Sequence, residues 1–195
     1  MKFAFVSGNT ALDLAGTVGS RRDGPVDALA APADLERWVA ECGEFSGLRG
    51  LPGLLGQVPA DLPAFESALA LREAIYRLAY DRVLDRPFDP RSLEIVNETA
   101  AGPVPTIKLS DAGLRMSGDL VAVLSHVARS GIAVLADPHV CLKECGRTGC
   151  TRIYLDRSRG ARRTWCGMDE CGNRVKAAAY RARRRATGVP PRPAR

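Results

Sequence analysis

Two cysteine pairs, CGRTGC at 145–150 and CGMDEC at 166–171, set the organisation of this chain. Each pair has the spacing Cys-x4-Cys, and fifteen residues separate the two pairs. Two short cysteine loops joined by a spacer of this length are typical of a site in which four thiolates bind one zinc ion, with Zn–S bonds of about 2.3 Å. We therefore predict that Cys145, Cys150, Cys166 and Cys171 bind one Zn²⁺ per chain.

The alternatives are two disulfides or four free thiols. Disulfides need an oxidising compartment, which nothing in the sequence indicates, and chance does not explain the paired spacing. Cys141 lies four residues before Cys145 and competes with it as a ligand, because shorter spacings are also common. The matched spacing of the two pairs favours Cys145. The zinc would be structural, since four thiolates leave no coordination position open for water or substrate.

The length and composition indicate a globular protein. With 195 residues, of which 46% are hydrophobic, the chain can form one ordinary domain and a small module. No apolar run approaches the roughly 18 residues of a membrane span. The opening sequence MKFAFVSGNT is too short for the apolar part of a secretory signal. We therefore expect a cytoplasmic protein with no membrane partner.

The charge is distributed unevenly along the chain. Residues 1–140 contain 13 Lys and Arg against 18 Asp and Glu, whereas residues 141–195 contain 15 against 4. An acidic body thus precedes a strongly basic C-terminal part, and such asymmetry favours binding to a polyanion. Because the basic residues are mainly arginines in one block, a merely solvated surface is the weaker interpretation.

The hydrophobic periodicity predicts an α+β protein. Residues 1–138 should form a mainly helical domain, with a helical turn from Thr10, a helix starting at the N-cap Asp34, and a small β-hairpin at 106–117. Further helices are expected at 64–84, 91–101 and 119–136. Residues 47–63 are rich in turn residues.

A small, treble-clef-like ββα zinc finger is expected at 141–187. Its strands should lie at 151–155 and 163–165, on either side of a turn, and its helix at 173–186. Residues 188–195, which contain three prolines, should form a disordered tail. Cys42 fits a core position on its helix.

The last helix is the predicted nucleic-acid interface. At 100° per residue one face carries only small apolar residues, which we expect to pack on the zinc knuckle: Val175, Ala178, Ala179, Ala182 and Ala186. Arg174, Arg181 and Arg185 form a stripe at one edge of this face, and the other cations occupy the rest of the exposed arc. Because arginine forks onto phosphate or guanine, this basic surface fits duplex DNA. The candidate contacts are Arg162, Arg163, Arg174, Lys176, Arg181, Arg184 and Arg185. Some of these arginines would alternatively offset the negative charge of a four-thiolate zinc site.

Two other functions need consideration. We expect Tyr154, Trp165 and Tyr180 to be exposed, so they could stack on unpaired bases, although a place in the core of the small module is the favoured interpretation of Trp165. The finger would then bind RNA, or it could bind an acidic protein. No catalytic constellation is evident, so we do not expect an enzyme. Asp13 and Thr17 are the candidate ligand-binding residues of the body, although an N-cap or a buried hydrogen bond would also explain them.

The segment RRTWCGMDECGNRVKAAAYRARR at 162–184 resembles the CGNR zinc fingers, which take their name from the run at 171–174. The segment CTRIYLD at 150–156 resembles the upstream Cys, aromatic and Asp pattern of that family. The resemblance implies that Cys145, Cys150, Cys166 and Cys171 are the ligands and that Cys141 is extra.

The N-terminal part resembles the companion domain of these fingers, called ABATE. ALDLAGT at 11–17 is similar to its Leu-Asp-Phe-x-Asn-Thr signature, with Leu14 in place of the aromatic residue and Gly16 in place of Asn. Residues 34–39 and 70–78 fit as well. The resemblance implies a bacterial, stress-related transcription regulator whose finger binds DNA. The body would then sense a small-molecule effector or form a homodimer.

Overall fold

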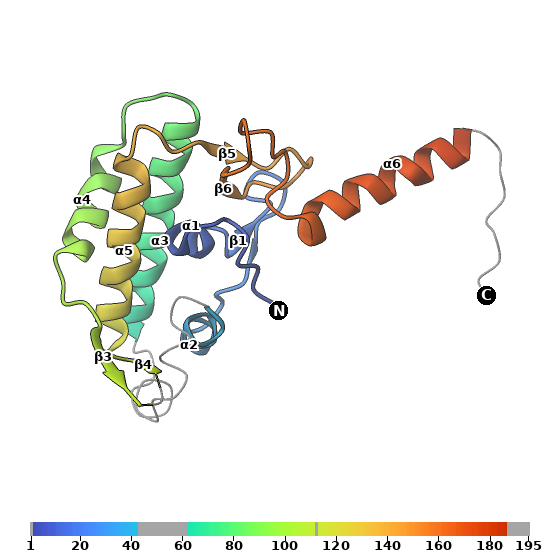
Figure 1. Ribbon diagram of the computed structural model, residues 1–195. Helices are drawn as coiled ribbons and strands as arrows, with labels where there is room; N and C mark the ends of the chain where they lie inside the picture. The colour runs from blue at the N-terminus through green and yellow to red at the C-terminus, as the bar shows by residue number, and fades with distance from the viewer. Residues whose placement is uncertain (1, 43–61, 112, 187–195) are drawn as a thin grey trace.

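The computed structural model describes residues 2–42, 62–111 and 113–186. Three helices lie side by side and form the body: α3 (Leu62–Val83), α4 (Pro90–Ala100) and α5 (Leu120–Ala136) (Figure 1). The short α1 (Thr10–Ala15) packs against α3 and α5, and α2 (Pro32–Glu41) lies near one end of α3. The predicted α+β class, with a helical body, is confirmed.

The central helix α3 is buried along the predicted stripe. Ala68, Leu71, Ile75 and Leu78 are at most 1% exposed, because their spacing of three and four residues puts them on one helix face. Asp89 and Asp119 cap α4 and α5 by accepting hydrogen bonds from the amides of Ser92 and Ala122. These caps fix where the two helices begin.

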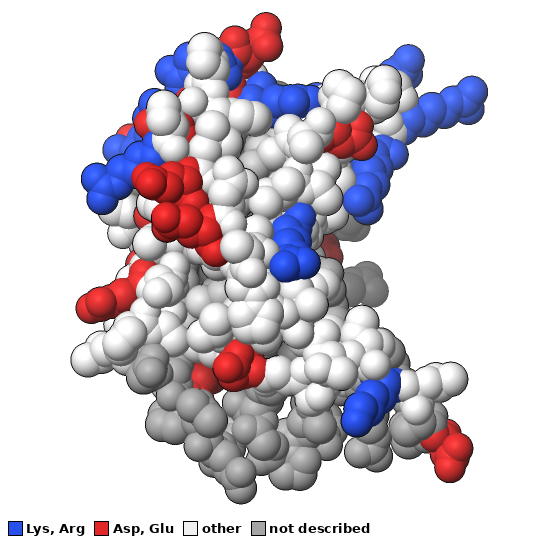
Figure 2. All heavy atoms as spheres, turned by 90° about the vertical axis from the view of Figure 1, so that its left-hand side faces the viewer, with Lys and Arg blue, Asp and Glu red and all other residues white. Residues whose placement is uncertain are grey.

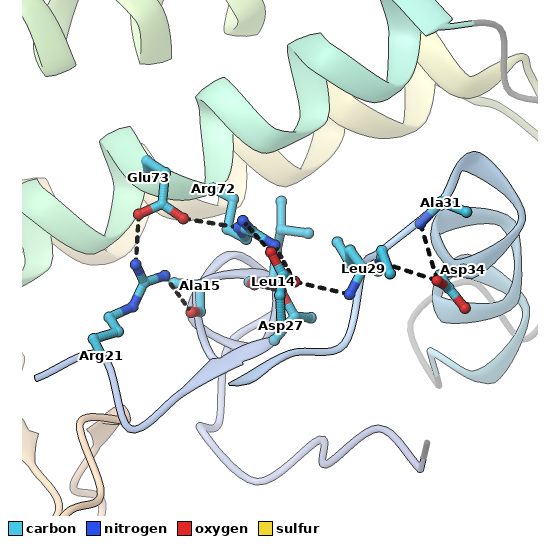
Figure 3. A network of polar contacts seen from close by, with 11 residues as sticks. Leu14, Ala15, Arg21, Asp27, Leu29, Ala31, Asp34, Arg72 and Glu73 are labelled. Atoms are coloured by element: carbon cyan, nitrogen blue, oxygen red, sulfur yellow. Dashed lines mark hydrogen bonds and ion pairs between the residues drawn. The ribbon is translucent and has the colours of Figure 1, made fainter. Parts of the chain in front are cut away.

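The predicted N-cap of α2, Asp34, was wrong by three residues. The N-cap position is Ala31, and Asp34 lies one turn inside the helix. From there its carboxylate reaches back and accepts hydrogen bonds from the amides of Ala30 and Ala31, both at 3.0 Å (Figure 3). Asp34, at the third position of the helix, therefore accepts hydrogen bonds from backbone amides at the N-terminal end, as the acidic residue of a capping box does.

The body carries two small antiparallel strand pairs. β1 (Val18–Gly19) pairs with β2 (Val26–Asp27), and β3 (Thr106–Ser110) pairs with β4 (Gly113–Ser117). The second pair is the predicted hairpin, with Ile107 opposite Met116. Most of the predicted turn-rich segment 47–63 and all of the predicted tail 188–195 lie outside the described residues.

A buried arginine ties β2 to the body. Arg72 of α3 is 5% exposed, and its two terminal nitrogens donate to the two carboxylate oxygens of Asp27 at 2.7 and 2.8 Å. Glu73 lies between Arg72 and Arg21 and accepts from both (Figure 3). A bidentate pair of this kind fixes orientation as well as distance, so the segment before α2 is held against α3.

The zinc-finger strands differ from the prediction. β6 (Ile153–Leu155) has the expected place, but its antiparallel partner is β5 (Leu142–Glu144), which precedes the first cysteine pair. The predicted strand at 163–165 was wrong. Arg163 there donates from its amide to Asp156 Oδ2 and accepts at its carbonyl from the Tyr154 hydroxyl. These side-chain hydrogen bonds replace a strand ladder.

The finger and the body share one core. Ile153 and Leu155 of β6 are buried together with the apolar residues of the helices. The backbone of the N-terminal lead also joins the finger, because Leu155 N donates to Ser7 O at 2.8 Å. The η2 turn (Met168–Gly172) and α6 (Asn173–Ala186) follow the second cysteine pair, and α6 points away from the body (Figure 1).

Candidate metal centre and nucleic-acid interface

Four cysteine sulfurs meet beside β6. The Sγ atoms of Cys145, Cys150, Cys166 and Cys171 all lie within 4.8 Å of one another. Tetrahedral zinc with bonds of about 2.3 Å needs sulfurs slightly less than 4 Å apart, and Cys166 Sγ lies 3.5 Å from Cys171 Sγ. The geometry and the chemistry of the donors therefore fit one structural zinc ion held by these four residues.

The backbone around each cysteine is fixed locally. Cys145 N donates to Arg152 O at 2.9 Å, Cys150 N to Arg147 O at 2.9 Å, and Cys171 N to Gly167 O at 3.0 Å. Cys166 N donates to the sulfur of Cys145 at 3.4 Å, which links the two pairs. Hydrogen bonds from Cys145 and Cys166 lower the pKa of the Cys150 thiol, whereas the same contacts raise the pKa of the Cys145 and Cys166 thiols.

Two arginines donate to the sulfurs, and neither was predicted from the sequence. Arg147 Nε lies 3.1 Å from Cys171 Sγ, and an Nη atom of Arg152 lies 3.6 Å from Cys166 Sγ. The hydrogen bond to Cys171 raises the pKa of the Arg147 guanidinium. Because four thiolates and Zn²⁺ carry a net charge of −2, these cations stabilise the site. Each arginine follows a ligand by two residues, which is the signal that could have identified them.

The other two cysteines lie outside the metal cluster. Cys42 is 3% exposed and belongs to the core of the body, as predicted. Cys141 is half-buried, and its carbonyl accepts a hydrogen bond from Asp156 N at 2.8 Å. It therefore precedes β5 as part of the strand pair and does not replace Cys145.

The run Cys171-Gly172-Asn173-Arg174 joins the metal site to α6. Cys171 is a ligand, and the Asn173 amide donates to Asp169 Oδ1 at 3.1 Å at the start of the helix. Gly172 allows close packing, since a Cβ there would lie 2.6 Å from Met168 Sδ. Arg174 is exposed. The first three residues of the run are therefore structural, and the fourth faces solvent.

Helix α6 projects from the finger, and among the described residues no other element covers its outer part. It packs on η2, and its small-residue face is open: Ala178, Ala179 and Ala182 are exposed and Val175 is half-buried. The prediction that this face packs on the zinc knuckle was wrong, because the helix axis points away from the knuckle after its first turn (Figure 1). Nothing is described of the side chain of Ala186.

Most of the predicted nucleic-acid contacts lie on an accessible surface. The exposed ones are Arg162, Arg174, Lys176, Arg181 and Arg185. Arg184 is half-buried, with its guanidinium 5.8 Å from the ring centre of Tyr180. The face of the body shown in Figure 2, on the side away from α6, carries acidic and basic side chains together. The described helix α6, by contrast, carries several cations and no acidic residue.

Arg163 has a structural role that the prediction did not anticipate. Its guanidinium donates to the carbonyls of Trp165, Val6 and Cys166, and it lies 4.5 Å from the ring centre of Tyr154. These contacts fasten the second cysteine pair to the N-terminal lead. The guanidinium of Arg163 is therefore used in contacts within the protein. Its neighbour Arg162 is exposed.

The three aromatic side chains considered for base stacking have different environments. Tyr154 is fully buried under Arg163, so its predicted exposure was wrong. Trp165 packs half-buried against the zinc cluster, and Tyr180 is 55% exposed on α6. Only the last of the three presents a largely exposed ring.

Asp13 and Thr17 both lie at α1 and are buried. Thr17 Oγ1 donates to Leu14 O at 2.7 Å and so completes the C-terminal turn of α1. Asp13 accepts from Ser7 N at 2.9 Å, and burial raises the pKa of its carboxyl to about 6. Both residues line a small cavity of about 110 Å³, together with Arg152. Thr17 thus forms a buried hydrogen bond of the kind considered as the alternative to ligand binding.

Comparisons with known proteins give one match for the helical body and one for the zinc finger. Residues 8–138 match the family ABATE, described as "Putative stress-induced transcription regulator", and residues 142–184 match the CGNR zinc finger. A search of curated proteins finds no match. Within residues 2–42, 62–111 and 113–186, no helix combines the length and the apolar character needed to cross a membrane.

Proposed function

Since this chain belongs to the ABATE family and carries a CGNR zinc finger, we propose that it regulates transcription by binding duplex DNA through α6. The observation that carries the proposal is the composition and exposure of this helix. Its 14 residues contain six cations and no acidic residue, and no other described element covers its outer part. A helix of this length spans about 21 Å and fits the major groove, which is about 12 Å wide.

The two faces of α6 would have different roles in the groove. Arg181 and Arg185, one turn apart, can neutralise phosphates or fork onto guanine. Ala178, Ala179 and Ala182 are small, so they would let the helix approach the base edges and contact thymine methyl groups. The zinc ion would not contact DNA itself. It would fix the position of η2 and thereby the direction of α6.

The exposure of the aromatic residues favours duplex DNA over single strands. Single-strand binders use several accessible aromatic rings as stacking platforms, but Tyr154 is buried and Trp165 is partly covered. Tyr180 alone offers an exposed ring among the three, and Arg184 lies 5.8 Å from its ring centre. Stacking on unpaired bases would therefore contribute little.

The proposal is tested with the zinc-loaded protein and fluorescently labelled nucleic acids of one random-sequence pool, as duplex and as single strand. We expect preference for the duplex, and an affinity that falls steeply with salt because several phosphate counterions are released. Selection of bound duplexes from the pool would then give the recognised sequence. Absence of salt-sensitive binding at low ionic strength, or preference for the single strand, would contradict the proposal.

A further inference from the structure

A cavity of about 410 Å³ lies where the helical body meets the zinc finger. Its walls come from the N-terminal lead and α1, from the end of α2, from α5 and from the turn after β6. The volume lies within the range of about 300–1,000 Å³ that is usual for small-molecule sites. The metal centre and α6 do not use this cavity, and of the residues predicted to bind a ligand only Asp13 lines it.

Asp13 supplies one charge to the cavity. Its side chain belongs to a residue that is only 9% exposed, and its Oδ1 accepts one hydrogen bond, from Ser7 N at 2.9 Å. It forms no ion pair with any residue in the described part of the chain. Burial has a larger effect on this carboxyl than the charge of Arg152 and the hydrogen bonds from Ser7 and Val6, so a cation bound beside Asp13 would stabilise its charged form.

Arg157 supplies the opposite charge from the finger. It is exposed on the turn after β6, where Asp156 Oδ1 accepts from the amide and the hydroxyl of Ser158 at 2.9 and 2.6 Å. Among the described residues, Arg157 has no hydrogen bond or ion pair. Arg157 and Asp13 line the same cavity, and no ion pair joins them in the described part of the chain.

The remaining walls offer one polar donor and an apolar surface. The Asn9 amide is fully used, since Oδ1 caps α1 and Nδ2 donates to Ser130 Oγ at 2.7 Å. Ser130 accepts that bond, so its own hydroxyl proton can be donated to a ligand. Phe5 and Cys42 form an apolar part of the wall that can receive a side chain.

We propose that this cavity binds a small zwitterion of the amino-acid type, with its ammonium group at Asp13 and its carboxylate at Arg157. Simple amines would satisfy only the acid, and simple carboxylates only the arginine. A ligand held by both charges would bridge α1 of the body and the turn after β6 of the finger, and so strengthen their docking. The binding rests on the cavity alone; its effect on DNA rests on the proposed function.

Isothermal titration calorimetry with the zinc-loaded, full-length chain at neutral pH tests the proposal. The probes are glycine, L-alanine, L-leucine and L-phenylalanine, which fill increasing shares of the cavity. For L-leucine, isoamylamine lacks the carboxylate and isocaproate lacks the ammonium group. We expect at least one amino acid to bind, and about tenfold or weaker binding for its two analogues, since each forms one charge-assisted hydrogen bond fewer.

Three variants locate the binding. Asp13→Asn keeps an oxygen for Ser7 N, and Arg157→Ala removes an exposed side chain, so zinc content and circular dichroism should stay as in the wild type. Each should weaken amino-acid binding about tenfold or more, whereas Arg159→Ala on the same turn should not change it. The proposal is overturned if none of the four amino acids binds, if the analogues bind equally well, or if Arg157→Ala binds like the wild type. DNA binding is measured in a separate experiment. A failure to bind duplex DNA would therefore contradict the proposed function without affecting the result for amino-acid binding.

Discussion

Arg152 contacts Gly16, and through this contact the zinc site meets the C-terminal end of helix α1. An Nη atom of Arg152 donates to Gly16 O at 3.3 Å, and the other Nη atom donates to Cys166 Sγ at 3.6 Å. A Cβ atom at Gly16 would lie 2.9 Å from Arg152 Nε. Gly16 stands where the ABATE signature usually has Asn, and in this chain the space of that side chain is taken by the arginine. The pair couples a residue of the body to a zinc ligand.

Gly16→Ala should therefore destabilise the protein although its backbone is αR, a conformation that alanine adopts freely. The added methyl group would displace the guanidinium from Gly16 O and Cys166 Sγ, at a cost of about 1–3 kcal/mol in the free energy of unfolding measured with urea. Gly19→Ala is the matched control, since its Cβ would meet only Val26 O at 3.9 Å. In an Arg152→Ala background the effect of Gly16→Ala should become smaller, because only the contact of the new Cβ with Leu12 O at 3.2 Å remains. An unchanged effect in that background would exclude the arginine as its cause.

Cysteine substitutions should separate the four ligands from Cys141. Cys145→Ser removes a zinc–thiolate bond and should lower the bound zinc well below one ion per chain, because serine is a poor ligand for zinc. Cys141→Ser should keep one zinc, since Cys141 lies outside the cluster. Atomic absorption on protein purified without chelator gives both values. Equal zinc loss in the two variants would mean that Cys141 takes part in binding.

Arginines on α6 should control affinity for DNA without affecting the metal. The double variant Arg181→Ala/Arg185→Ala should weaken duplex binding and reduce the salt slope of log K by about two, one for each phosphate that is no longer neutralised. Zinc content should not change, because the arginines that donate to the sulfurs are Arg147 and Arg152. The control is Arg91→Ala/Lys108→Ala, which removes two exposed cations of the body. If both doubles weaken binding equally, the interface is not localised to α6.

The sequence predicted those parts of the molecule that depend on local spacing. The stripe of α3, the β3–β4 hairpin and the four clustered cysteines each follow from residues a few positions apart, so periodicity reveals them. β5 could not be found in this way, because Leu142, Lys143 and Glu144 are too short a run to show alternation. The roles of Arg152 and Arg163 depend on contacts with Gly16 and Val6, more than 130 residues away along the chain.

The alanine face of α6 shows another limit of sequence patterns. An amphipathic helix has a face of small residues whether it packs on its own chain or on a partner. In this chain Ala178, Ala179 and Ala182 are exposed, so the pattern does not mark a core contact within the described part of the chain. To distinguish a buried face from an exposed one, the direction of the helix axis must be known, and this direction is set by η2.

Asp13 gives a prediction for stability as a function of pH. Burial raises the pKa of its carboxyl from the ordinary value of 3.8 to about 6, so the folded state binds the proton more tightly than the unfolded state. As pH rises from about 4 to about 6, the unfolded state ionises first, and the wild type loses stability, by up to roughly 3 kcal/mol for a difference of two pKa units. Asp13→Asn has no such loss. We therefore compare the two proteins by subtracting the free energy of unfolding of the wild type from that of Asp13→Asn. This difference should increase with pH over this range and then level off. Protonation of the zinc thiolates affects both proteins alike, so it cancels in the difference. Urea unfolding from about pH 4 to pH 8 measures the difference, and a value that stays flat or falls would show that the carboxyl is not destabilised by burial.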